Sequence, residues 1–106
     1  KAAKEAASQQ AVLRSATERR LSEVTALLDR AERQLKAADA ARIPRRTTAP
    51  ARTAITAAEA SLQNAGTSIQ EGNYTVSQEQ LAESAAKLQS AMAEIDSVMK
   101  ARGKRK

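Results

Sequence analysis

Residues 55–76 read ITAAEASLQNAGTSIQEGNYTV, and they contain both a helix and the signal that ends it. The apolar residues of this stretch recur at alternating steps of three and four, which is the a/d pattern of an amphipathic helix. They are Ile55, Ala58, Leu62, Ala65 and Ile69. Gly66 lies inside the helix and weakens it by about 1 kcal/mol relative to Ala. We expect the helix to stop at Glu71-Gly72-Asn73, where Gly72 can take the left-handed conformation typical of a helix end.

Another helix is predicted after this turn. Residues 77–80, Ser-Gln-Glu-Gln, form a capping-box pattern, so we prefer Ser77 to Thr75 as the N-cap residue. We expect this helix to end around Arg102-Gly103 and to be followed by a frayed basic tail. Its apolar stripe consists of Leu81, Ala85, Leu88, Met92, Ile95 and Val98 or Met99.

A longer amphipathic helix precedes these two and is predicted from about Ala2 to Arg42. Its apolar stripe consists of Leu13, Thr17, Leu21, Val24, Leu28, Ala31, Leu35 and Ala38, with Leu27 beside it. Ile43-Pro44 ends the helix, because the residue before a proline is disfavoured in the helical region. Residues 45–49 are predicted as a loop, with Thr48 as N-cap and Pro50 near the first turn of the next helix.

The composition favours close helix packing over a bulky core. Of 44 apolar residues in a chain of 106, 25 are Ala and only 19 are larger. Leu, Ile and Val make up only about 15 % of the chain, a content at which disorder is the alternative interpretation. The regular apolar stripes argue against disorder. Ala is the best helix former, and two Pro and three Gly leave long stretches unbroken. The sequence therefore predicts an all-α, antiparallel up-down-up three-helix bundle.

The predicted helices differ in length, on the order of 60, 33 and 40 Å at a rise of 1.5 Å per residue. The two shorter helices can therefore cover only part of the first one. We divide the chain into an N-terminal helical extension at residues 1–19, the bundle at residues 20–102 and a basic tail at residues 103–106. The extension protrudes, bends or is covered by a partner chain.

Short repeats and one turn carry a resemblance to known proteins. Residues 31–38, 58–65 and 84–91 align, and each contains a Leu followed three residues later by Ala. Two explanations are open: an internal duplication, or the general similarity of Ala-rich amphipathic helices to one another. The Gly72-Asn73-Tyr74 turn resembles that of a tetratricopeptide-type hairpin, although no full 34-residue repeat is present. Residues 21–99 as a whole are similar to a bacterial family of Ala-rich envelope domains, which implies a periplasmic or membrane-tethered, lipoprotein-like protein.

Catalytic chemistry is not expected. The chain has no His and no Cys, which excludes zinc fingers, thiolate nucleophiles and Ser-His-Asp triads. Glu79 with Glu83, and Glu94 with Asp96, bring carboxylates together, but both pairs fall on the polar side of their helix. We therefore predict no enzyme activity, no cofactor and no metal site. No apolar run approaches the roughly 18 residues of a membrane span.

The net charge of +6 is unevenly distributed. Residues 1–20, 43–52 and 100–106 carry +3, +3 and +5, whereas residues 53–99 carry −5. In an up-down-up bundle the first connection and the C-terminus lie at the same end, so their cations are predicted to form one basic pole. Its candidate binding residues are Arg42, Arg45, Arg46, Arg52, Lys100, Arg102, Lys104, Arg105 and Lys106.

A simpler explanation competes for part of this pole. Positive charge at helix C-termini complements the helix dipole, which suffices for Arg42, Lys100 and Arg102. The acidic residues Glu71, Glu79 and Glu83 are predicted at the opposite end of the bundle.

We expect a non-catalytic binding or scaffolding module of the cell envelope, whose basic pole docks on an anionic surface or an acidic partner protein. A cytoplasmic nucleic-acid-associated protein is the alternative. It is disfavoured because Tyr74 is the only aromatic residue and no helix-turn-helix or basic-zipper pattern is present. A third interpretation is a helical homo-oligomer in which another copy covers the Ala-rich N-terminal extension.

Overall fold

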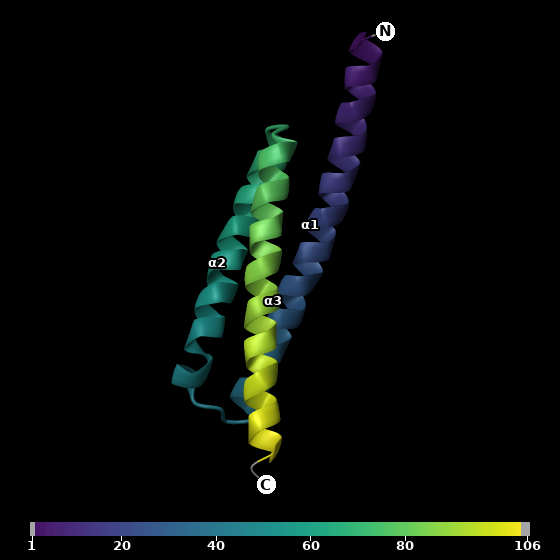
Figure 1. Ribbon diagram of the computed structural model, residues 1–106. Coiled ribbons are helices and arrows are strands. Elements are labelled where there is room, and N and C mark those ends of the chain that lie inside the picture. Colours follow the sequence, from purple (N-terminus) through teal and green to yellow (C-terminus); the bar gives the residue numbers. More distant parts are fainter. Residues whose placement is uncertain (1, 105–106) are drawn as a thin grey trace.

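A computed structural model describes the backbone of residues 2–104 and the side chains of residues 9–102. Residues 2–104 form three α-helices: α1 (Ala2–Ala40), α2 (Arg45–Gln70) and α3 (Tyr74–Lys104). Consecutive helices are antiparallel, with α1 and α3 running in the same direction, in an elongated bundle of 68 × 20 × 16 Å (Figure 1). The prediction of an all-α three-helix bundle is confirmed.

The core follows a seven-residue repeat in every helix. Leu81, Leu88 and Ile95 of α3 are the largest fully buried side chains, and they are spaced seven residues apart. The matching position on α1 is occupied by fully buried residues that are smaller, namely Thr17, Val24, Ala31 and Ala38. The same spacing on α2 buries Ala51, Ala58 and Ala65. Apolar residues at heptad spacing keep one face of each helix against its neighbours, as in coiled coils.

Small residues allow α2 and α3 to approach closely. The hydroxyl of Ser84, on α3, donates a hydrogen bond of 3.1 Å to the backbone carbonyl of Ala58, on α2, and both residues are fully buried. A side chain as short as serine reaches a neighbouring helix backbone only when the two helices lie close together. The bond also satisfies a hydroxyl that would otherwise be buried without a partner.

The connection between α2 and α3 is a Schellman turn. Gly72 has a φ of 78°, the left-handed conformation that the sequence predicts for it. The N–H of Asn73 donates to the carbonyl of Ser68 at 2.8 Å, and the N–H of Gly72 donates to that of Ile69 at 3.0 Å. These two bonds satisfy carbonyls at the end of α2 that have no partner within the helix.

The predicted start of α3 is wrong by four residues. The helix begins at Tyr74 instead of after Ser77. The hydroxyl of Ser77 points back along the helix and donates to the carbonyl of Asn73 at 2.7 Å, so it does not cap an N–H group. Gln80 likewise does not complete a capping box, because its side chain accepts a hydrogen bond of 3.0 Å from Ser68 on α2. The Schellman turn leads directly into α3, so Ser77 already lies inside the helix, where its N–H donates to the carbonyl of Asn73 at 3.0 Å.

The connection between α1 and α2 has the same form but a different residue at its centre. The N–H of Ile43 donates to the carbonyl of Ala38 at 3.1 Å, and the N–H of Arg42 donates to that of Asp39 at 3.0 Å. Arg42 occupies the position of Gly72 and has a φ of 63°. A residue with a Cβ is strained there by about 1–2 kcal/mol. The turn is held by Ile43, which is buried as the hydrophobic residue that such turns commonly carry.

The predicted loop at residues 45–49 is also wrong, because α2 already begins at Arg45 with Pro44 as its N-cap. Pro44 has a φ of −56°, which leads the chain into the helix, and its carbonyl accepts the first bond from the N–H of Thr47 at 3.0 Å. Thr48 is not a cap but a buried helical residue, whose hydroxyl donates to the carbonyl of Arg45 at 3.2 Å. Pro50 lies in the second turn, where it removes one donor from the helix.

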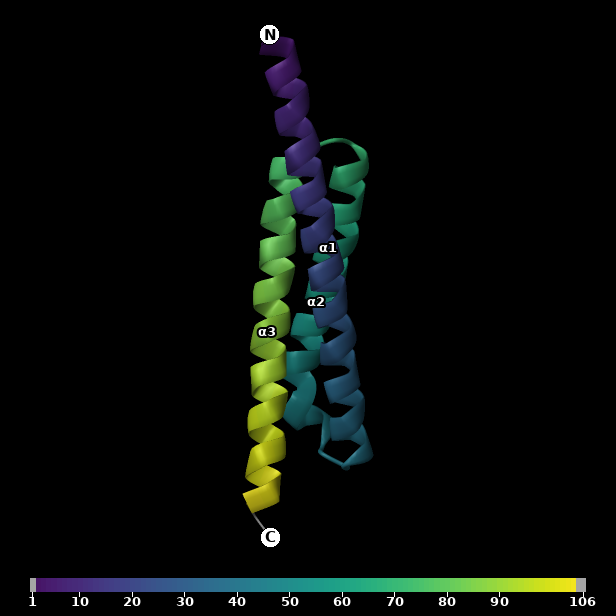
Figure 2. The ribbon, with the colours of Figure 1, turned by 90° about the vertical axis from the view of Figure 1, so that its right-hand side faces the viewer.

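The N-terminal part of α1 continues past the turn between α2 and α3 (Figures 1 and 2). Packing of α1 on α3 reaches Thr17, which is fully buried and accepts a hydrogen bond of 3.1 Å from the side-chain amide of Gln78. Contact with the bundle therefore begins within the segment that the sequence assigns to the extension. Val12, one turn further out, leaves 70 % of its surface exposed.

The two Schellman turns should respond in opposite ways to glycine substitution. Arg42→Gly removes the strain of a left-handed arginine, and we expect it to raise the free energy of unfolding by up to about 1 kcal/mol. Gly72→Ala introduces that strain, and we expect a loss of about 1 kcal/mol, because no atom lies near enough to add a clash. Urea denaturation followed by circular dichroism measures both. A loss of stability in Arg42→Gly would contradict the proposed strain.

Close packing of α2 against α3 predicts a strong size dependence at Ala58. Ala58→Leu should lower the free energy of unfolding by about 1–3 kcal/mol, because the added carbons have no space beside Ser84. Ala60→Leu, an exposed position on the same helix, is the matched control and should change stability by less than about 0.5 kcal/mol. Equal effects of the two substitutions in urea denaturation would show that the helices do not approach closely at this level.

Candidate anion-binding pole

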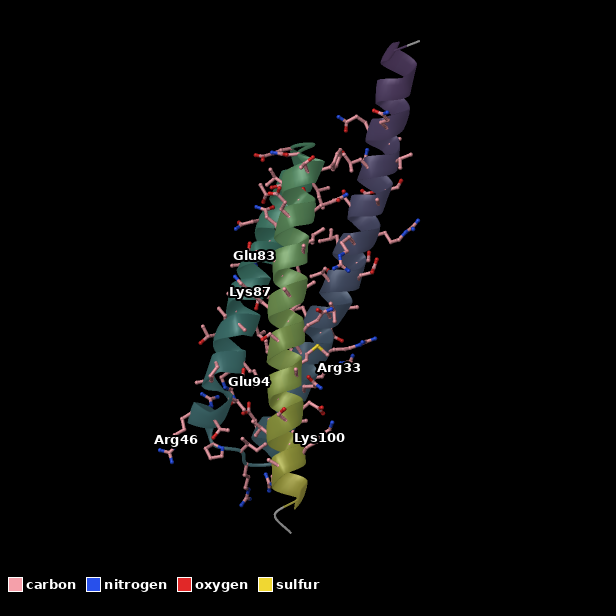
Figure 3. The ribbon with its side chains drawn as sticks, in the orientation of Figure 1. Arg33, Arg46, Glu83, Lys87, Glu94 and Lys100 are labelled. Atoms are coloured by element: carbon pink, nitrogen blue, oxygen red, sulfur yellow. The ribbon has the colours of Figure 1, made fainter. Side chains whose placement is uncertain are left out.

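The structure brings the predicted basic residues together at one end of the bundle. This basic pole consists of the α1–α2 connection, the first turns of α2 and the last turns of α3, and it carries Arg42, Arg45, Arg46, Arg52, Lys100 and Arg102. Arg46 and Lys100 lie at this end, and Arg46 extends away from the bundle (Figure 3). Lys104 is the last residue of α3, and its side chain lies outside the described part. Arg105 and Lys106 lie outside the described residues altogether.

Two of these cations are paired with carboxylates. The guanidinium of Arg52, on α2, donates a hydrogen bond to the carboxylate of Asp39, on α1, and only 27 % of the Arg52 side chain is exposed. Lys100 lies 3.2 Å from the carboxylate of Asp96 one turn earlier on α3. Arg52 therefore links α1 to α2 and is less available to an external anion than the sequence suggests, whereas the Lys100 side chain stays 73 % exposed.

The four remaining arginines are exposed and unpaired. Arg42, Arg45, Arg46 and Arg102 form no ion pair with any acidic residue among residues 9–102. The explanation from helix dipoles fits Arg42 and Arg102, which lie at the C-terminal ends of α1 and α3.

The helix dipole does not explain Arg45 and Arg46. They are the first two residues of α2, at its positive end, where a cation is repelled by the dipole. No side chain caps this helix and no acidic residue lies in its first turn. The fold thus places two unpaired arginines at a position where they cost stability, and this makes the pole strongly electropositive.

A shallow groove of about 440 Å³ opens at the pole, between the α1–α2 connection and the last turns of α3. Its apolar lining comes from Ile43 and Pro44 on one side and from Val98 and Ala101 on the other. Arg42, Arg102 and Thr47 supply its polar groups, and no acidic residue lines it. The sequence shows the arginines but not the groove, because Val98 and Ala101 meet Ile43 only after the chain has folded.

The opposite end of the bundle is acidic, as predicted. Glu71 lies in the α2–α3 turn, and Glu79 lies in the second turn of α3; both are exposed. Glu83 is exposed too and pairs with Lys87 at 2.9 Å (Figure 3). The Gly72-Asn73-Tyr74 turn is also located here, and Tyr74 is half-buried as the first residue of α3. The bundle is therefore electrically asymmetric along its long axis.

The extension offers a different kind of surface. Gln9, Val12, Leu13 and Ala16 form an open, nearly flat face on α1 that contains almost no polar surface. Its apolar character continues the stripe that packs against α3 from Thr17 onward. That a second copy of the chain covers this face stays a prediction.

Protein-family models, curated proteins and solved structures were each compared with this chain, and none of them matches it significantly. The resemblance to envelope domains therefore stays a prediction. Along the described helices, no stretch is both long and apolar enough to cross a membrane. The part of the chain that the structure describes also contains no group of three or more side chains that could hold a metal ion.

Proposed function

We propose that this protein is a non-catalytic docking module of the bacterial cell envelope, periplasmic or membrane-tethered, whose basic pole binds an anionic phospholipid surface. The envelope location follows from the resemblance of residues 21–99 to Ala-rich envelope domains. The choice of an anionic surface as partner follows from the charges at the pole.

The observation that carries this proposal is the placement of Arg45 and Arg46. Both are exposed at the positive end of α2, where they destabilise the isolated chain and have no acidic partner among the described residues. An external anion would remove this cost. A basic residue near an anionic membrane contributes about 1 kcal/mol, so the four unpaired arginines together contribute about 4 kcal/mol.

The shape of the molecule favours end-on docking. The unpaired arginines lie at one tip of a 68 Å rod, and the exposed acidic residues Glu71 and Glu79 lie toward the other end. A negative surface attracts the first end more strongly, because at the second end these carboxylates offset the +3 carried by residues 1–20. The extension of α1 then points away from the surface and serves as a spacer.

Nucleic acid is the less suitable anion. Single-stranded nucleic acid is bound largely by stacking on aromatic side chains, and Tyr74, the only aromatic residue, is half-buried at the end opposite the basic pole. A gel shift with duplex and single-stranded DNA across a salt series tests this alternative directly. Retardation stronger than binding to anionic vesicles at the same salt concentration would favour it.

Vesicle co-sedimentation tests the proposed docking. We expect the protein to sediment with vesicles of phosphatidylglycerol and phosphatidylcholine at 0.05 M salt and to remain in solution at 0.5 M salt, because salt screens contacts of this kind. Vesicles of phosphatidylcholine alone should not bind it. Absence of sedimentation with the anionic vesicles at low salt would refute the proposal.

A matched pair of double variants separates the pole from net charge. Arg45→Gln with Arg46→Gln, and Arg19→Gln with Arg30→Gln, both lower the net charge from +6 to +4. Arg19 and Arg30 are exposed on α1, away from the pole. Two contacts of about 1 kcal/mol each predict a loss of vesicle affinity of about 30-fold for the first variant. The second should lose less than about threefold, and equal losses would show that net charge alone determines binding.

A further inference from the structure

The groove at the basic pole combines two properties that a purely electrostatic contact does not need. Its lining is apolar at Ile43, Pro44, Val98 and Ala101, and it also carries the unpaired cations Arg42 and Arg102. A hydrophilic anion would leave the apolar surface unused, and a hydrocarbon would leave the arginines unused. A molecule with an anionic head and an alkyl chain matches both.

The conformation of Arg42 is an independent sign that its side chain is used. At the equivalent position of the other turn the chain has Gly72, which takes the left-handed conformation without strain. At position 42 the chain carries an arginine in the same conformation, and that arginine lines the groove. Strained backbone conformations of this type cluster at active sites and ligand-binding positions.

We propose that this groove binds one anionic lipid of the docked membrane surface, with the headgroup phosphate at Arg42 and Arg102 and the beginning of an alkyl chain over Val98 and Ala101. A volume of about 440 Å³ lies in the lower part of the range of ligand pockets, so it holds part of one lipid while the rest stays in the bilayer. The arginines attract the headgroup, and the apolar lining retains the chain. This assignment rests on the proposed function and adds a specific site to it.

Soluble probes isolate the site from the bilayer. Dodecyl phosphate supplies the anionic head plus the chain, dodecyl maltoside supplies the chain with an uncharged head, and inorganic phosphate supplies the anionic head alone. Both dodecyl compounds are used below the concentration at which they form micelles. We expect saturable binding of dodecyl phosphate by titration calorimetry, with amide NMR shifts concentrated at residues 42–47 and 98–102. The other two probes should bind at least tenfold more weakly. Equal affinity for dodecyl maltoside or for inorganic phosphate would overturn the combined site.

Substitutions on α3 test the groove, and those at Ala101 and Ala93 do so without changing charge. Ala101 is exposed and lines the groove, so Ala101→Trp should fill it and reduce the affinity for dodecyl phosphate at least tenfold. Ala93→Trp, at an exposed position of α3 outside the groove, is the control and should bind as the wild type does. Arg102→Gln, with helicity checked by circular dichroism, should also lose at least fivefold. Unchanged binding in Ala101→Trp and Arg102→Gln would overturn the site.

The two proposals fail separately in this design. Arg45 and Arg46 do not line the groove, so their double replacement by Gln should weaken vesicle sedimentation and leave dodecyl phosphate binding intact. Ala101→Trp should keep salt-sensitive sedimentation, because all four arginines remain. If the wild type binds dodecyl phosphate but does not sediment with anionic vesicles, the docking function is refuted. If it sediments but does not bind dodecyl phosphate, the groove site is refuted.

Discussion

The close approach of α2 and α3 is the constraint on which the rest of this structure depends. The chain has no Phe or Trp and a single Tyr, so it cannot fill wide gaps between helices. Instead, fully buried small residues at heptad spacing let the helices pack close together, and Ser84 of α3 donates a hydrogen bond to the backbone of Ala58 on α2. Three helices packed in this way form a rod only 20 × 16 Å in cross-section, and every functional feature must lie on its ends or its surface.

The ends owe their properties to the way in which the helices are connected. Both connections are Schellman turns, but one is centred on Gly72, next to Glu71, and the other on Arg42, near Arg45 and Arg46. The first is relaxed and the second is strained. The burial of Ile43 holds the strained turn in place, and with it the start of α2 and the first two arginines of that helix. The packing of one isoleucine thus determines where the unpaired charges lie.

Much of this fold can be predicted from the sequence, because stripes at helical spacing and a glycine at a helix end are local signals. Residues such as Val24, Ile55 and Leu88 are recognised in this way, as is the turn at Gly72. The starts of α2 and α3 are missed, because both depend on the preceding turn, and at Ile43 that turn depends on tertiary packing. Thr48 and Ser77 look like caps in isolation, but both are buried and bond to the carbonyl of an earlier residue.

The candidate site shows the same limit. Up-down-up topology is enough to predict that the cations meet at one end. The pairing of Arg52 with Asp39 depends on the axial register between α1 and α2, and the groove depends on where the last turns of α3 meet Ile43. Neither register is encoded in any short stretch of sequence. Arg52 is the example: the sequence presents it as a free cation, but the packing of α1 on α2 pairs it with Asp39 and leaves it less available to an external anion.

Because α1 is one continuous helix, the extension has a fixed rotational orientation relative to the packed part of the bundle. From Ala2 to Ala40 the helix contains neither glycine nor proline, so the backbone offers no hinge between the extension and the packed part. Each residue of a helix advances about 1.5 Å and turns about 100°. One residue inserted between Leu13 and Thr17 would turn the apolar face at Val12 by about 100° around the axis and leave the packed part of the bundle where it is. The number of residues between Val12 and the packed part of α1 therefore determines the direction in which the apolar face points around the helix axis.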